Sequence, residues 1–174
     1  GDLSQATVYL TINGQNDAPL LAGAAATIEE DGPAIIVDLA GLGSDVDSDD
    51  DENSLDYTIH SAPLAGLATI ADNSLSIQSH GDFQKLAVGE TAVVTVGVTA
   101  SARHGATASN EIAVTVTGSN DLPVLAADFA DVAEDESVVV DVLGNDMDID
   151  ASDILRIAST SSAAHGSVSL IDGD

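Results

Sequence analysis

The sequence contains no cysteine and no tryptophan, and its 174 residues include only two Phe and two Tyr. The absence of cysteine excludes a disulfide framework and a thiolate zinc site. No stretch reaches 18 apolar residues, so we expect no segment that inserts directly into a membrane. The first four residues, Gly1–Ser4, lack the basic and apolar regions of a signal peptide. We therefore expect the chain to begin inside a longer protein.

Basic residues are almost as rare, since three Lys and Arg face 30 Asp and Glu, for a formal net charge of −27. A chain so acidic repels polyanions, which excludes nucleic acid and anionic membrane surfaces as partners. Acidic chains that are poor in aromatics are often disordered, but 44% of these residues are hydrophobic. The sequence therefore predicts a folded chain whose core consists of Val, Ile, Leu and Ala.

An internal repeat sets the domain organisation. Residues 8–21 read VYLTINGQNDAPLL and residues 112–125 read IAVTVTGSNDLPVL, an offset of 104 residues. Both copies are an alternating strand followed by Gly-x-Asn-Asp-x-Pro. A period of this length is too long for a solenoid and is typical of tandem domains.

The repeat predicts three parts of the chain. Residues 1–15 form the closing strand of a preceding repeat, 16–119 form a complete domain, and 120–174 form the first half of the following repeat. Each Asn-Asp-x-Pro is then a short linker. Its proline fixes φ and favours an extended predecessor, which keeps successive domains roughly in line.

Within 16–119 the hydrophobic pattern has period two and is interrupted by turn residues. On the penultimate strand, Val94, Val96 and Val98 would face the core, while Val93 and Thr95 would face outward. One helical turn is expected within 82–88. Seven short strands predict an all-β, immunoglobulin/cadherin-like Greek-key sandwich, tandemly repeated. The expected strands are 25–28, 35–39, 55–60, 68–70, 75–78, 91–100 and 111–117.

Two acidic loops occupy equivalent places in the repeats, at 45–52 (DVDSDDDE) and 146–153 (DMDIDASD). Alternating carboxylates on an extended loop project to one side about 6–7 Å apart. Calcium, with oxygen ligands at about 2.3–2.6 Å, can bridge them, whereas magnesium demands tighter octahedral geometry. The loops lack local His and Cys for zinc and do not fit the EF-hand pattern.

A solvated surface or an adaptation to high salt would also account for the acidity, and many of the carboxylates are simply solvated. A single Asp-x-Asp would indicate only a polar loop. Two copies in register, each near an Asn-Asp linker and a Glu-Asp pair, favour calcium ligands. A domain that lacks disulfides also needs another source of stability, and a bound metal is a common one.

The order Asn-Asp-x-Pro, Glu-Asp, Asp-x-Asp resembles the cadherin-like and VCBS-type repeats of large bacterial RTX adhesins. Residues 82–92 (DFQKLAVGETA) and 115–121 (TVTGSND) are similar to the final part of such a repeat, so the resemblance covers essentially the whole chain. Ala102 departs from it, because the family often has Asp at this position. The glycine-rich nonapeptide calcium repeats are also absent.

The resemblance implies a type I-secreted protein of the bacterial cell surface in which calcium rigidifies tandem domains. It places ligands at the junction after residue 119, namely Glu30 or Asp31, Asn120, Asp121, Asp146, Asp148 and Asp150. The preceding junction would use Asn16, Asp17, Asp45, Asp47 and Asp49. Glu134 and Asp135 are the equivalent pair of the following repeat, and the resemblance implies that they too are metal ligands, at a further junction.

We therefore expect a monomeric, calcium-binding extender module for cell adhesion or biofilm formation, whose partners are the neighbouring repeats of its own chain. The alternative is a carbohydrate-binding module, although aromatic platforms for a sugar are scarce. We expect no enzyme, because the chain shows no nucleophile elbow and no phosphate-binding loop. His104-Gly105 and His165-Gly166 are typical of turns rather than of catalysis.

Overall fold

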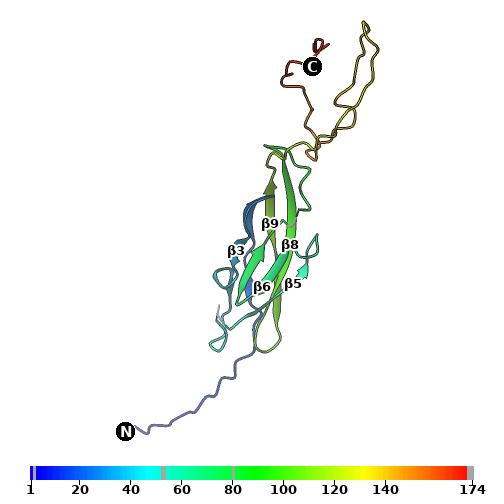
Figure 1. Ribbon diagram of the computed structural model, residues 1–174. Helices are drawn as coiled ribbons and strands as arrows, with labels where there is room; N and C mark the ends of the chain where they lie inside the picture. The colour runs from blue at the N-terminus through cyan, green and yellow to red at the C-terminus, as the bar shows by residue number, and fades with distance from the viewer. Residues whose placement is uncertain (2, 52–53, 80, 172–174) are drawn as a thin grey trace.

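The computed structural model describes residues 1, 3–51, 54–79 and 81–171. Nearly all of its regular structure lies in one elongated body within residues 20–117, and the segments before and after this body leave from opposite ends (Figure 1). The strands are β1 (Leu20–Leu21), β2 (Ala24–Glu29), β3 (Ile35–Asp38), β4 (Gly43–Ser44), β5 (Asp56–Ser61), β6 (Ala68–Ala71), β7 (Ser74–Ile77), β8 (Thr91–Ser101) and β9 (Thr107–Thr117).

Two sheets form the body. One has the order β2-β9-β8-β5 and the other the order β3-β7-β6, while β1 and β4 make a separate short pair. Strand β2 runs parallel to β9, and the other pairs are antiparallel. The all-β sandwich expected from the sequence is confirmed, and each of the seven predicted strands is present within a few residues of its expected bounds.

The alternation of β8 places the core as predicted. Val96 and Val98 are fully buried and Val94 is partly buried, whereas Val93 is exposed. The three inward-facing valines pack in one cluster with Leu75 and Ile77 of the second sheet. Burial of each such side chain stabilises the fold by about 1.5–3 kcal/mol, so an aliphatic core compensates for the scarcity of aromatics.

Three local features differ from the expectation. Strands β1 and β4 and the 3₁₀ helix Ala40–Leu42 are too short to leave a periodic signal. The hairpin of β8 and β9 is longer than predicted, and its turn at 102–106 uses Gly105 at a φ of 89°. The expected helical turn in 82–88 is wrong, because this stretch folds as consecutive turns.

Outside the body, regular pairing is sparse. Within 120–171 the structure shows an isolated bridge between Val124 and Met147, at the positions equivalent to the paired Leu20 and Ser44. The described residues of 1–15 form no strand. The division into a closing strand, a complete repeat and half a repeat therefore stays a prediction. No helix among the described residues is long and apolar enough to cross a membrane.

Candidate metal centre

Glu30 follows directly after strand β2 and is held on both its backbone and its side chain. Its N–H donates to the Thr117 carbonyl over 3.0 Å, and the Ser79 hydroxyl donates to its carbonyl. The residue is 2% exposed, and its carboxylate accepts the Ser119 N–H at Oε1 over 2.7 Å. The second oxygen, Oε2, is buried without a hydrogen-bond partner.

Asp121 of the linker and Asp150 of the acidic loop lie close to the Glu30 carboxylate. The Asp121 N–H donates to Asp150 Oδ2 over 2.9 Å, and the Asp150 N–H donates to Asp148 Oδ1 over 3.0 Å. The Asn120 side chain donates to the Asp121 carbonyl. Asp150 is 2% exposed. Both Asp121 Oδ2 and Asp150 Oδ1 are buried and lack a hydrogen-bond partner.

One carboxylate oxygen each from Glu30, Asp121 and Asp150 lies within 4.8 Å of the others. We call these three residues the junction triad. Among the described residues they are the only group of three His, Cys, Asp or Glu side chains gathered so closely. Glu30 follows β2, whereas Asp121 and Asp150 lie beyond β9, so the triad joins the body to the segment that follows it.

Electrostatics make this arrangement costly. Burial raises the pKa of the Glu30 carboxyl, and the neighbouring charges of Asp31, Asp121 and Asp150 raise it further, against the hydrogen bond from Ser119. Burial likewise raises the pKa of Asp121, with added repulsion from Asp31, Asp150 and Asp148. Buried carboxylates without partners are unfavourable unless a cation or a proton compensates them.

The chemistry of the donor set fits calcium. All three side chains offer carboxylate oxygens, the ligands that hard divalent cations prefer, and each has one oxygen to spare. The triad contains neither the imidazole nor the thiolate that zinc favours. Backbone carbonyls and water can complete the larger coordination number of calcium.

The other predicted acidic ligands of this junction have hydrogen bonds of their own. Asp31 is exposed, and its Oδ1 accepts the Gln84 side-chain N–H over 2.7 Å. Asp148 orients Asp150 through the bond described above. Asp146 accepts the Ala126 N–H over 2.8 Å and thereby connects the acidic loop to the segment after the linker.

The preceding linker repeats the same local geometry. The Asp17 N–H donates to Asp47 Oδ2 over 2.7 Å, and the Asp47 N–H donates to Asp45 Oδ1 over 3.0 Å. The Asn16 side chain donates to the Asp17 carbonyl over 2.7 Å. The structure therefore brings four of the predicted residues together here. A counterpart of Glu30 would have to come from a preceding repeat.

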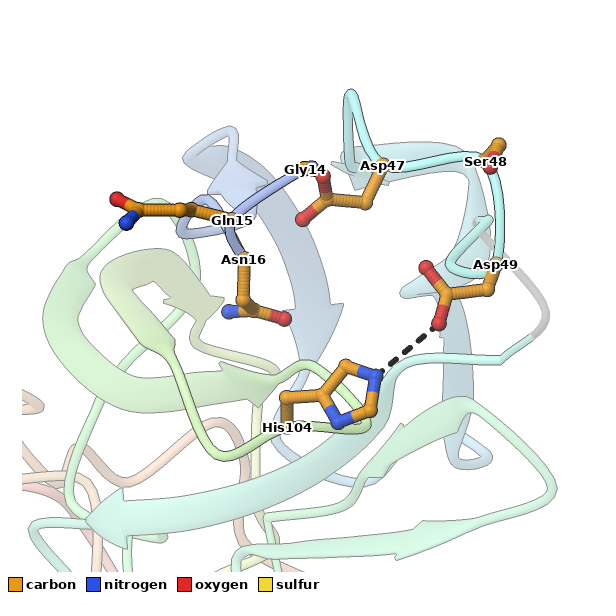
Figure 2. Close-up of a pocket in the computed structure, with 7 residues that line it drawn as sticks. All are labelled: Gly14, Gln15, Asn16, Asp47, Ser48, Asp49 and His104. Carbon is orange, nitrogen blue, oxygen red and sulfur yellow. Dashed lines mark hydrogen bonds and ion pairs between the residues drawn. The ribbon is translucent and has the colours of Figure 1, made fainter. Parts of the chain in front are cut away.

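Asp49 faces a different neighbour. Figure 2 shows its carboxylate beside His104, with Asp49 Oδ2 at 3.1 Å from His104 Nε2. The hydrogen bond from His104 lowers the pKa of the exposed Asp49 carboxyl. They line a cavity of about 260 Å³ together with Gly14, Gln15, Asn16, Asp47 and Ser48.

Sequence reasoning missed Asp50, which is the buried residue among the described members of its acidic run. Asp50 is 5% exposed, and its Oδ1 accepts the Arg103 N–H over 3.2 Å. Its Oδ2 is buried without a hydrogen-bond partner. A run of consecutive acidic residues carries no signal that tells which one turns inward. Glu52, in the same run, lies outside the described residues.

Glu134 and Asp135 are exposed in a turn, where Asp135 adopts a φ of 66°. They do not join another acidic cluster among the described residues. Their predicted role at a further junction requires a repeat that follows residue 174, so it stays a prediction.

The sequence profile of the bacterial Ig domain matches residues 16–116 and again residues 120–174, and the chain belongs to this family. The fold agrees, since two sheets pack around one aliphatic core. A comparison with curated proteins finds no match.

Two solved structures are similar to parts of the chain. The extracellular cadherin domains 1–4 of protocadherin gamma B7 match 68% of this chain at 16% identity and a TM-score of 0.48, and the chain spans 29% of that structure. A nucleoside hydrolase-related hypothetical protein from Saccharophagus degradans, associated with carbohydrate metabolism, matches 59% at 17% identity and a TM-score of 0.37. The chain spans 26% of that second protein.

Proposed function

We propose that this chain is a calcium-binding extender of a secreted bacterial surface adhesin, in which the cation fixes the angle between consecutive repeats. The observation that carries the proposal is the junction triad. Glu30, Asp121 and Asp150 each place one carboxylate oxygen within 4.8 Å of the others, and each carboxylate has a buried oxygen without a hydrogen-bond partner.

The residues around the triad hold it ready for a cation. The Ser119 N–H orients the Glu30 carboxylate, and Asp148 holds the backbone of Asp150. A calcium ion compensates the negative charge of these carboxylates. Because its ligands belong to two repeats, binding removes the rotational freedom of the linker between them.

The extracellular, adhesive setting is supported by the family and by the sequence. The chain belongs to the bacterial Ig domains, and its motif order resembles that of VCBS-type repeats in RTX adhesins. Extracellular calcium modules bind with a Kd of roughly 10⁻⁴–10⁻³ M, which suits a surface protein that meets millimolar calcium. The elongated body leads into each neighbour from an opposite end, as a stalk requires (Figure 1).

Calorimetric calcium titration of Glu30→Gln and of its matched control Glu29→Gln tests the proposal. Both substitutions remove one negative charge, but Glu29 is exposed on β2 whereas Glu30 is buried in the triad. We expect Glu30→Gln to weaken binding about tenfold or more and Glu29→Gln to leave it nearly unchanged. Equal affinities in the two variants would remove the triad from the calcium site.

A further inference from the structure

Ser79 and residues 81–90, which we call the junction strap, lie beside Glu30 and Asp31 of the complete repeat. The strap holds the Glu30 backbone through Ser79 and the Asp31 side chain through Gln84. At its end, the Glu90 carbonyl accepts the Gly118 N–H over 2.9 Å. The strap is thereby fixed to its own domain by side-chain and backbone bonds.

Gly118 packs so closely against the strap that a side chain would not fit at this position. A Cβ atom at this position would overlap the backbone carbonyl oxygens of Leu86 and Ala87. These obstacles are main-chain atoms and cannot move aside as a flexible side chain would. Because Gly118 is only two residues before Asn120, the strap sets the direction in which the chain enters the linker.

The strap also contacts the following repeat directly. The Ala151 N–H donates to the Lys85 carbonyl over 3.1 Å. Lys85 shares a cavity of about 380 Å³ with Val124, Met147, Asp148 and Ile149. The four-carbon stem of a lysine can cover apolar surface while its ammonium stays near water or an acidic neighbour, and this cavity offers both kinds of surface.

Comparison of the two repeats indicates that the strap covers part of this surface. Ile149 and Val46 occupy equivalent positions, yet Ile149 is 48% exposed and Val46 is 75% exposed. Ile149 lies in the cavity that Lys85 lines. Val46 is at the other end of the complete repeat, where the strap of a preceding repeat would lie.

We propose that the junction strap is a docking surface for the following repeat of the same chain, and that this contact forms without a cation. The occupant is the segment 147–151 together with Val124, as the Ala151 hydrogen bond and the shared cavity indicate. The inference rests on the tandem arrangement in the proposed function but not on calcium. The junction then has two parts, a strap contact that positions the repeats and a triad that locks them.

Hydrogen exchange of the Ala151 amide, measured by NMR on the 174-residue chain, tests this inference. With a chelator present, we expect this amide to exchange at least about tenfold more slowly than a solvated amide, because its N–H is bonded to the strap. Ile149→Ser should abolish this protection in chelator. The matched control Val46→Ser removes an equivalent exposed side chain away from the strap and should leave the protection intact.

The outcomes separate the two proposals. If the Ala151 amide is protected only when calcium is present, the docking proposal is overturned and the calcium proposal is not. An Ala151 amide that is unprotected under both conditions would also overturn it, while the Glu30→Gln titration would still decide the calcium site. Equal loss of protection in Ile149→Ser and Val46→Ser would likewise contradict docking, because general destabilisation would then explain it.

Discussion

The backbone N–H of Asp121 donates to the carboxylate of Asp150 over 2.9 Å. The equivalent bond recurs from Asp17 to Asp47 over 2.7 Å. Each linker is therefore tied to the acidic loop of the repeat that follows it. Glu30 is the one member of the triad that lies in the body of residues 20–117, so its carboxylate connects the site to that body.

Calcium should stabilise the chain against heat. At a tenfold excess over its Kd, one site adds about 1.4 kcal/mol through RT ln(1 + [L]/Kd). For a domain of about 100 residues, such a gain raises the melting temperature by roughly 4–8 °C per kcal/mol. Differential scanning calorimetry with calcium and with chelator measures it. Identical melting curves would mean that the acidic loops are only solvated surface.

Asp150→Asn should weaken calcium binding about tenfold while it changes the calcium-free fold little. The amide keeps an oxygen that can accept the Asp121 N–H, but the charge that attracts the cation is lost. Asp128→Asn is the control, because Asp128 is exposed in the same repeat and lies outside the triad. Calorimetry that shows equal losses for both variants would indicate a diffuse charge effect.

Asp45→Asn combined with Asp47→Asn should lower calcium binding at the preceding linker without unfolding the complete repeat. Both residues lie in a loop, and Asp47 retains an oxygen for the Asp17 N–H. Calcium titration followed by NMR should show smaller shifts near Asn16 and unchanged shifts near Asp121. If the shifts near Asn16 are unaltered, the cation binds elsewhere among the carboxylates.

Without calcium, stability should increase as the pH falls from neutral toward the ordinary Glu pKa of 4.5. The folded-state pKa of Glu30 is raised, so in this window the folded chain binds more protons than the unfolded one. Stability is consequently lost as the pH rises through the raised pKa. Melting curves of Glu30→Gln should have a flatter pH dependence than those of Glu29→Gln. An equal pH dependence of stability in the two variants would contradict a raised pKa of the buried Glu30 carboxyl in the absence of a cation.

Gly118→Ala should destabilise the complete repeat by about 1–3 kcal/mol, as expected when atoms are forced into a packed site. Its Cβ would overlap the carbonyl oxygens of Leu86 and Ala87. Gly14 occupies the equivalent place in the repeated motif, and a Cβ there meets nothing within 4 Å. Gly14→Ala should therefore leave chemical denaturation unchanged. Equal denaturation midpoints for the two variants would mean that the strap moves aside at little energetic cost.

The sequence predicted the strands because the alternation of β8 and its neighbours encodes which face is buried. The resemblance to adhesin repeats implied Glu30 or Asp31 together with Asp121 and Asp150 among the ligands of one junction, and the structure brings Glu30, Asp121 and Asp150 close together. The sequence could not distinguish Asp49 from Asp50, since their burial depends on the distant turn that carries Arg103 and His104. The contact of Lys85 with Ala151 likewise depends on how the repeats meet, which leaves no periodic pattern.

The width of the distance distribution between two repeats tests the stalk mechanism most directly. Because the chain has no cysteine, spin labels can be attached uniquely at Thr69→Cys in the complete repeat and Ser137→Cys in the next, both exposed. Pulsed electron spin resonance should give a narrow distribution with calcium and a broader one with chelator. Sodium chloride should not replace calcium, because screening weakens repulsion without bridging ligands. Equal widths with calcium and with chelator would contradict a cation that locks the junction, even if each repeat still bound the ion.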